Sequence, residues 1–168
     1  MKSRTPASTH KRVVVVLFDH SAVKGYLNPA LLGRTEAIEM LTMDGEHRSV
    51  ALADAKSVYF VREFSEPFEP ERKAFLSRPK LDGLWVRLQF RDEDVVEGIV
   101  ANNLLELVDA GVQLTPPDLH GNVVRMFVPR TSLTEMKVLG VVGAARRTPQ
   151  GEERGRARGP EQPKLFSE

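Results

Sequence analysis

The sequence predicts a mainly β protein that consists of two tandem small bent β-barrels. Short apolar runs alternate with turn signals along most of the chain, which is typical of small all-β domains. One motif occurs twice, as "VLFDHSAVKGYLNPALL" from Val16 and as "LQFRDEDVVEGIVANNLL" from Leu88. In each copy a glycine, Gly25 or Gly98, precedes two apolar residues, three others and a Leu-Leu pair. A glycine inside a return strand marks a bulge or bend, which lets a small sheet curl.

The first predicted barrel covers residues 12–64. Its opening run "VVVVLF" is β-branched and continuously apolar, so we expect a strand that is covered on both faces. The polar turn "DHSA" leads into the return strand. "NPALLG" predicts one helical turn, capped by Asn28, with Pro29 first and Gly33 as the stop. Three further strands are expected, in "AIEMLTM", "SVALA" and "SVYFV".

The second predicted barrel covers residues 83–143. Its first strand alternates strictly between two faces, with Leu84, Val86, Leu88 and Phe90 inward and Trp85, Arg87 and Gln89 outward. The predicted turn "RDEDV" is one residue longer than the turn "DHSA" of the first copy. The remaining strands are expected in "LLELVDAGVQL", "VVRMFVP" and "MKVLGVV", so that each copy has about five.

Three segments lie outside the predicted barrels. Residues 1–11 are expected to form a flexible basic arm. Residues 65–82 are rich in proline and mixed charge, which indicates a linker, and "PERKAFL" predicts a short helix within it. Residues 144–168 are rich in glycine, proline and charge, so that we expect a disordered tail.

The stretch "RMFVPRTSLTEMKVLGVV" resembles the last two strands of Sm-like and SH3-like barrels. The segment "FLSRPKLDGLWVRLQFRDEDVVEG" resembles a bacterial domain family of unknown function that is associated with such barrels. These resemblances imply a duplicated Sm/SH3-like fold and no particular activity.

Composition excludes several classes of function. The net charge of +1 is too small for bulk attraction to a polyanion, so that a nucleic-acid role requires a local patch. The chain has no cysteine, which rules out disulfides, zinc thiolates and cysteine nucleophiles. No phosphate-binding glycine loop or nucleophile elbow occurs. We therefore expect a cytoplasmic, non-enzymatic protein with no catalytic residues, metal, cofactor or membrane segment.

One surface predicts a binding site. Trp85 and Arg87 are expected to face outward in one strand. In "VVRMFVP" alternate residues are expected to face inward, namely Val124, Met126 and Val128, so that Arg125 and Phe127 face outward. Aromatic rings beside arginines suit single-stranded nucleic acid or nucleotides. The alternative interpretation is that Trp85 covers the linker or the other barrel.

The C-terminus carries a second candidate. Gln162, Leu165 and Phe166 in "QPKLF" resemble the Gln-x-x-Leu-Phe peptide with which bacterial replication and repair proteins bind the sliding clamp, although Lys164 departs from the usual small or acidic residue. The alternative interpretations are a chance match and a segment that docks on the protein itself.

The expected function is a binding, adaptor or regulatory module for a protein or a nucleotide-type ligand. The competing expectation is a nucleic-acid- or replication-associated protein that uses its basic tail or the clamp-like peptide. A cyclic dinucleotide is not expected: Asp19, Ser21 and Gly25 are spaced one residue too far apart for the Asp-x-Ser-x-x-Gly signature of PilZ-type receptors.

Overall fold

The computed structural model describes residues 9–70, 72–106 and 110–143, and the mainly β prediction is confirmed. Most of the predicted arm and the whole predicted tail lie outside these residues. The described chain contains the following strands: β1 (Lys11–Leu17), β2 (Ala22–Leu27), β3 (Ala37–Thr42), β4 (His47–Ala51), β5 (Ala55–Val61), β6 (Gly83–Phe90), β7 (Val95–Val100), β8 (Gly111–Leu114), β9 (Val123–Pro129) and β10 (Leu133–Val142).

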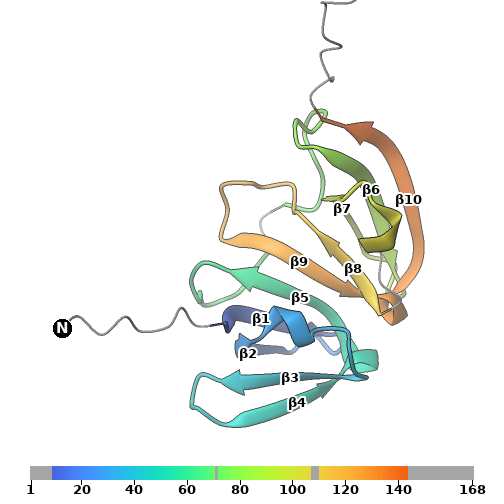
Figure 1. Cartoon of the computed structure of the whole chain (residues 1–168). Coiled ribbons are helices and arrows are strands. Elements are labelled where there is room, and N and C mark those ends of the chain that lie inside the picture. The colour runs from blue at the N-terminus through green and yellow to red at the C-terminus, as the bar shows by residue number, and fades with distance from the viewer. Residues whose placement is uncertain (1–8, 71, 107–109, 144–168) are drawn as a thin grey trace, which may run out of the picture.

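The strands form two antiparallel sheets (Figure 1). A seven-stranded sheet has the order β4-β3-β2-β1-β5-β9-β8, and a three-stranded sheet has the order β10-β6-β7. Each half of the chain thus supplies five strands, as expected from the sequence. The two halves share the larger sheet because β5 pairs with β9, with Val58 opposite Phe127.

The strand pairings of the two halves correspond. In the first half β5 and β2 flank β1, and β3 and β4 follow on the side of β2. In the second half β10 and β7 flank β6, a bridge between Ile99 and Thr115 links β7 to the end of β8, and β9 follows. Among the described residues neither sheet closes on itself.

The two hairpin turns have the same length, which corrects the expected extra residue in the second. The Leu17 N–H donates to Ser21 O at 2.9 Å, and the Phe90 N–H donates to Asp94 O at 2.8 Å. The third turn residue has positive φ in both copies, 68° at His20 and 70° at Glu93. The extra residue follows from matching Phe90 with Phe18, whereas the pairing register places Leu17 at the position of Phe90.

Gly25 and Gly98 occupy matching positions, opposite Val13 in β1 and Val86 in β6. At Gly25 an added Cβ would overlap the carbonyl oxygen of Leu41 in β3. At Gly98 it would overlap the Leu114 side chain of β8 and lie 3.0 Å from Thr115 O. Both glycines therefore let the next strand approach β2 or β7 closely.

The predicted helical turn after β2 is present as a 3₁₀ turn over Pro29–Leu31, and the Asn28 side chain accepts a hydrogen bond from Ala30 N at 3.1 Å. A similar turn, Leu104–Glu106, follows β7. The strand expected over "LLELVDAGVQL" is therefore shorter, because β8 begins only at Gly111.

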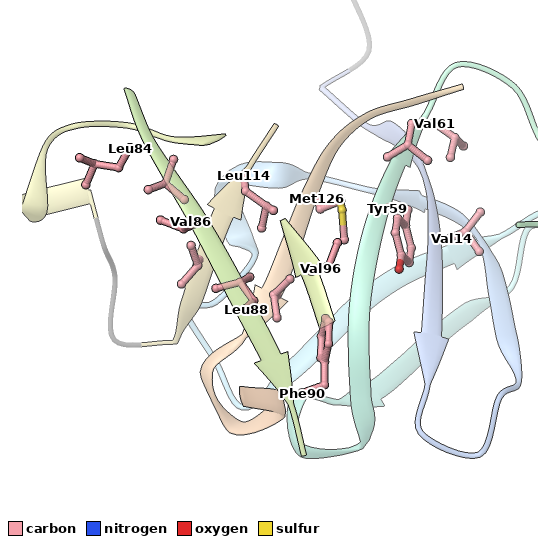
Figure 2. Close-up of a cluster of buried hydrophobic side chains, with 14 residues drawn as sticks. Val14, Tyr59, Val61, Leu84, Val86, Leu88, Phe90, Val96, Leu114 and Met126 are labelled. Carbon is pink, nitrogen blue, oxygen red and sulfur yellow. The ribbon is translucent and has the colours of Figure 1, made fainter. Parts of the chain in front are cut away.

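The hydrophobic core has two parts, which meet at β1. Val13 and Val15 pack in the first part and Val14 packs in the second, and all three are fully buried, so the prediction of a strand covered on both faces is confirmed. Figure 2 shows the second part, where Val86 and Leu88 of β6 face residues of β5, β8 and β9.

The linker crosses the two hairpins without forming the predicted helix, and its described residues are irregular. The reason is that Glu97 in β7 uses the backbone groups that a helix would need. The Glu97 N–H donates to Lys73 O at 2.7 Å, and the Phe75 N–H donates to the Glu97 carboxylate at 3.1 Å. Both linker phenylalanines pack on aromatic rings, Phe68 on Tyr59 and Phe75 on Trp85. Phe64, which directly precedes the linker, packs on Tyr26.

Candidate functional site

Trp85 and Arg87 lie on the same face of β6, where Glu97 and the linker engage them. Trp85 Nε1 donates to Glu97 Oε2 at 3.1 Å, and Arg87 Nη2 donates to Glu97 Oε1 at 3.2 Å. The Phe75 ring meets the Trp85 ring edge-on, with 6.1 Å between centroids. Trp85 is thus a linker contact, as the alternative interpretation of this face expected.

Glu97 joins this face to the linker. Its side chain is only 8% exposed, and burial by itself would raise its pKa. Hydrogen bonds from the Phe75 N–H, the Trp85 indole and the Arg87 guanidinium outweigh that effect and hold the pKa of Glu97 below its ordinary value. The carboxylate is therefore ionised at neutral pH and fastens the linker to the second hairpin.

The outward orientation predicted for Phe127 is wrong. Its side chain is 1% exposed and belongs to the first part of the core, whereas Val124, predicted to face inward, is 46% exposed. Because β9 joins the sheet of the first half, both of its faces are covered near Phe127, and an alternating pattern does not apply there. The four predicted residues therefore do not form one continuous platform.

Arg125 instead lines a different hollow, which we call the basic groove. It lies at the end of the larger sheet where β1 and β9 begin and β2 and β5 end, on the left in Figure 1. Its cavity volume is about 630 Å³. The cationic residues that line it are Lys11, Arg12, Arg62 and Arg125, with His10 beside them. Tyr26 and Phe60 contribute aromatic rings to the same wall.

Three of the four cations of the basic groove donate hydrogen bonds, and all of these go to neutral oxygens. Arg12 Nη1 donates to Arg62 O at 2.7 Å, and Arg62 Nε donates to Gly121 O at 3.2 Å. Arg125 Nη1 donates to the Gln113 amide oxygen at 3.4 Å. Over the described residues no carboxylate lies within 4 Å of these cations, so their positive charge is uncompensated locally.

Several other cations of the described residues are neutralised by carboxylates, unlike those of the basic groove. Lys24 pairs with Glu66, and Arg87 pairs with Glu97. Lys56 Nζ lies 2.7 Å from an Asp92 oxygen. In a chain of net charge +1 the basic groove thus brings four cations without carboxylate partners close together. Such a concentration attracts anions, because like charges that share a concave surface focus the field there.

Of the groove cations, only Arg125 is predicted as a binding residue from the sequence. Lys11 and Arg12 were assigned to the arm and the first strand, and Arg62 follows β5 without a motif of its own. The signal available in the sequence was that basic residues stand at the ends of two apolar runs, in "HKRVVVV" and "VYFVRE". Recognising it required knowing that β1 and β5 are antiparallel neighbours, which brings those ends together.

No group of three or more histidine or acidic side chains suited to a metal ion occurs in the described part of the chain. Within the same residues no helix has the length and apolar character needed to cross a membrane. The clamp-like residues Gln162, Leu165 and Phe166 lie outside the described residues.

Comparison with known protein families gives a match over most of the chain. The model of a family of unknown function (DUF6982) matches residues 9–140, which include all the strands except the last two residues of β10. Neither the curated proteins nor the solved structures contain a significant match to this sequence.

Proposed function

We propose that this chain, which belongs to the family of unknown function (DUF6982), is a non-enzymatic module that binds single-stranded nucleic acid in the basic groove. The observation that carries the proposal is the set of four cations, Lys11, Arg12, Arg62 and Arg125, without a carboxylate partner among the described residues. Phosphate groups are the ligands that such a set prefers.

The shape of the basic groove supports a single strand. The groove crosses β2, β1, β5 and β9, which are consecutive in the sheet. Three interstrand spacings correspond to roughly 14 Å, which is long enough for more than one phosphate. Arg12 and Arg62 are already oriented by backbone carbonyls, so that less side-chain entropy is lost when a ligand binds.

Aromatic side chains in the basic groove supply a surface for bases. Tyr26 is half-buried and stands edge-on to Phe64, with centroids 5.7 Å apart, which fixes the orientation of its ring. A base stacked on such a ring contributes about 1–3 kcal/mol and does so for every base. The expected binding is therefore sequence-tolerant.

The proposal also includes the two Sm/SH3-like barrels that the sequence predicts. Each half would be one small bent barrel of the Sm/SH3 kind, and the two halves would derive from a duplication. The matching strand pairings and the identical turns at His20 and Glu93 support this interpretation. Small barrels of this type commonly bind partners on their surface, although the fold by itself assigns no function. A cytoplasmic location is part of the proposal, since single-stranded nucleic acid is found there.

The test is fluorescence anisotropy with labelled single-stranded DNA and RNA of mixed sequence. The groove variant is Lys11→Gln with Arg125→Gln, and its matched control, with the same change in net charge, is Arg48→Gln with Lys80→Gln. Arg48 and Lys80 are exposed and lie outside the groove. We expect the groove variant to bind at least tenfold more weakly than the wild type and the control to bind like the wild type. Equal weakening of both double variants would show only non-specific attraction and would contradict the proposal.

Binding of the C-terminal peptide to the sliding clamp stays a prediction, and this contact would be separate from the basic groove. Titration of a peptide that contains residues 159–168 with the sliding clamp tests it, and a peptide with Leu165 and Phe166 changed to alanine is the control. Equal binding of the two peptides, or no saturation, would exclude a specific clamp contact.

A further inference from the structure

A second hollow, which we call the seam pocket, lies between the two halves of the chain and the linker. Tyr59, Phe90 and Met126 come from β5, β6 and β9, Phe68 comes from the linker, and the exposed linker residues Arg72 and Lys73 stand at its mouth. The pocket has a volume of about 220 Å³ and does not share these residues with the basic groove.

Tyr59, Phe68 and Phe90 give the seam pocket an aromatic wall, and the charged residues Lys56, Asp94 and Asp118 also line it. Tyr59, Phe90 and Met126 are each 8% exposed or less, and the Phe68 ring lies 5.0 Å from the Tyr59 ring. Figure 2 shows Phe90, Met126 and Tyr59 in the same cluster as Val96, with the Tyr59 hydroxyl at the end of its ring. A cavity of about 150 Å³ lined by apolar side chains already holds benzene, so this interior accepts one aromatic ring with a substituent.

One cation at the mouth has no counter-ion in the described chain. Lys56 lies between Asp92 and Asp94, and Lys73 Nζ lies 2.7 Å from Asp94 Oδ1. Arg72, by contrast, has no carboxylate within 4 Å among the described residues. A guanidinium presents paired donors that match a carboxylate in geometry.

A buried hydroxyl lies next to residues that line the pocket. Ser57 is fully buried, and its Oγ has no hydrogen-bond partner within the described residues. It stands opposite Val16 in the strand register and two residues before Tyr59, and both of these neighbours line the pocket. Burial raises the pKa of the Tyr59 phenol, and the nearby Ser57 hydroxyl offsets part of that effect. Ser57 thus interacts with Tyr59, which lines the pocket, and it is not a free group for a ligand.

We infer that the seam pocket binds a small aromatic monocarboxylate, with its ring between Tyr59, Phe68 and Phe90 and its carboxylate on Arg72. The aromatic interior selects the ring, and the unpaired guanidinium selects the sign of the charge. A ligand in this position touches β5, β6, β9 and the linker together, so it would also hold the linker against the two halves.

Calorimetric titration of the full chain with benzoate tests the inference, with benzylamine as the probe of opposite charge and benzyl alcohol as the neutral probe. We expect saturable one-to-one binding of benzoate, with both other probes weaker. Arg72→Ala should weaken benzoate binding at least tenfold, since it removes a charge-assisted hydrogen bond to the carboxylate. Arg72→Lys should restore part of the affinity, and Lys80→Ala, on the same linker, should leave it unchanged.

Ala22→Leu supplies a second test that does not depend on charge. Ala22 lines the seam pocket and is exposed, so that a larger side chain there fills the pocket without disturbing the core. This variant should fold like the wild type and lose benzoate binding. The inference is overturned by the absence of saturable benzoate binding, by benzylamine binding as tightly as benzoate, or by benzoate binding that neither Arg72→Ala nor Ala22→Leu alters.

Discussion

Replacement of Glu97 by alanine should destabilise the protein severely, because this carboxylate joins three parts of the fold. It accepts hydrogen bonds from the Phe75 N–H at 3.1 Å, the Trp85 indole at 3.1 Å and the Arg87 guanidinium at 3.2 Å. Removing one partner from a buried charged network costs about 3–5 kcal/mol. Since small domains are stable by about 5–15 kcal/mol, we expect the midpoint of urea unfolding to fall sharply.

Glu97→Gln keeps the shape of the side chain and an amide oxygen, so it should lose only the charge-assisted part, about 1–2 kcal/mol. Glu135→Ala is the control, because Glu135 forms an exposed pair with Lys137 and should cost less than about 0.5 kcal/mol. Emission of Trp85, the only tryptophan, should shift to longer wavelength in Glu97→Ala as the linker leaves the indole. A Glu97→Ala protein within about 1 kcal/mol of the wild type, with unchanged emission, would refute the role of Glu97 as the anchor of the linker.

Three further predictions concern stability. The pKa of Glu97 is lower in the folded protein than its ordinary value of 4.5. Its contribution to the free energy of unfolding is therefore present above pH 4.5 and is lost as the pH falls through the folded pKa. Urea unfolding at a series of acidic pH values should show this loss in the wild type but not in Glu97→Gln. Gly98→Ala should lower the free energy of unfolding by about 1–3 kcal/mol, because the new Cβ overlaps the buried Leu114 side chain of β8. Gly140→Ala should change the denaturation midpoint little, because the new Cβ would lie 4.0 Å from its nearest neighbour, the Arg78 side chain. Phe127→Ala should lower the free energy of unfolding by about 3–5 kcal/mol, and Val124→Ala should lower it by less than about 1 kcal/mol. Similar losses for the two variants in thermal or urea unfolding would contradict the orientation of β9.

Local pattern predicted most of the strands, because period-two alternation and turn residues are properties of short segments. The strand around Val14 was predicted as covered on both faces from its β-branched run alone, and it is. The cap at Asn28 followed from residue chemistry in the same way. These features depend on neighbours along the chain, which a sequence displays directly.

The errors arose where distant segments decide the structure. Phe127 was placed outward because its strand alternates, but the pairing of β9 with β5 buries it in the core of the other half. The helix expected around Phe75 is absent because the Glu97 carboxylate and N–H engage the linker backbone. Nothing in the local sequence records that Glu97 will lie there.

The candidate site, too, was predictable only where it depends on local sequence. Arg125 was predicted as a binding residue from its phase in one strand, but its partners Lys11, Arg12 and Arg62 come from two other segments. Their assembly depends on the strand order β2-β1-β5-β9. That order crosses between the two halves and has no signature in either half.

The salt dependence of single-stranded DNA binding tests the central claim most directly. If Lys11, Arg12, Arg62 and Arg125 each contact a phosphate, the logarithm of the association constant should fall with the logarithm of salt concentration with a slope of about −3, given roughly 0.7 per contact. Lys11→Gln with Arg125→Gln should reduce the magnitude of that slope by about 1.4, and Arg48→Gln with Lys80→Gln should leave it unchanged. A wild-type slope near zero, or the same slope for the wild type and the groove variant, would contradict phosphate binding in the basic groove.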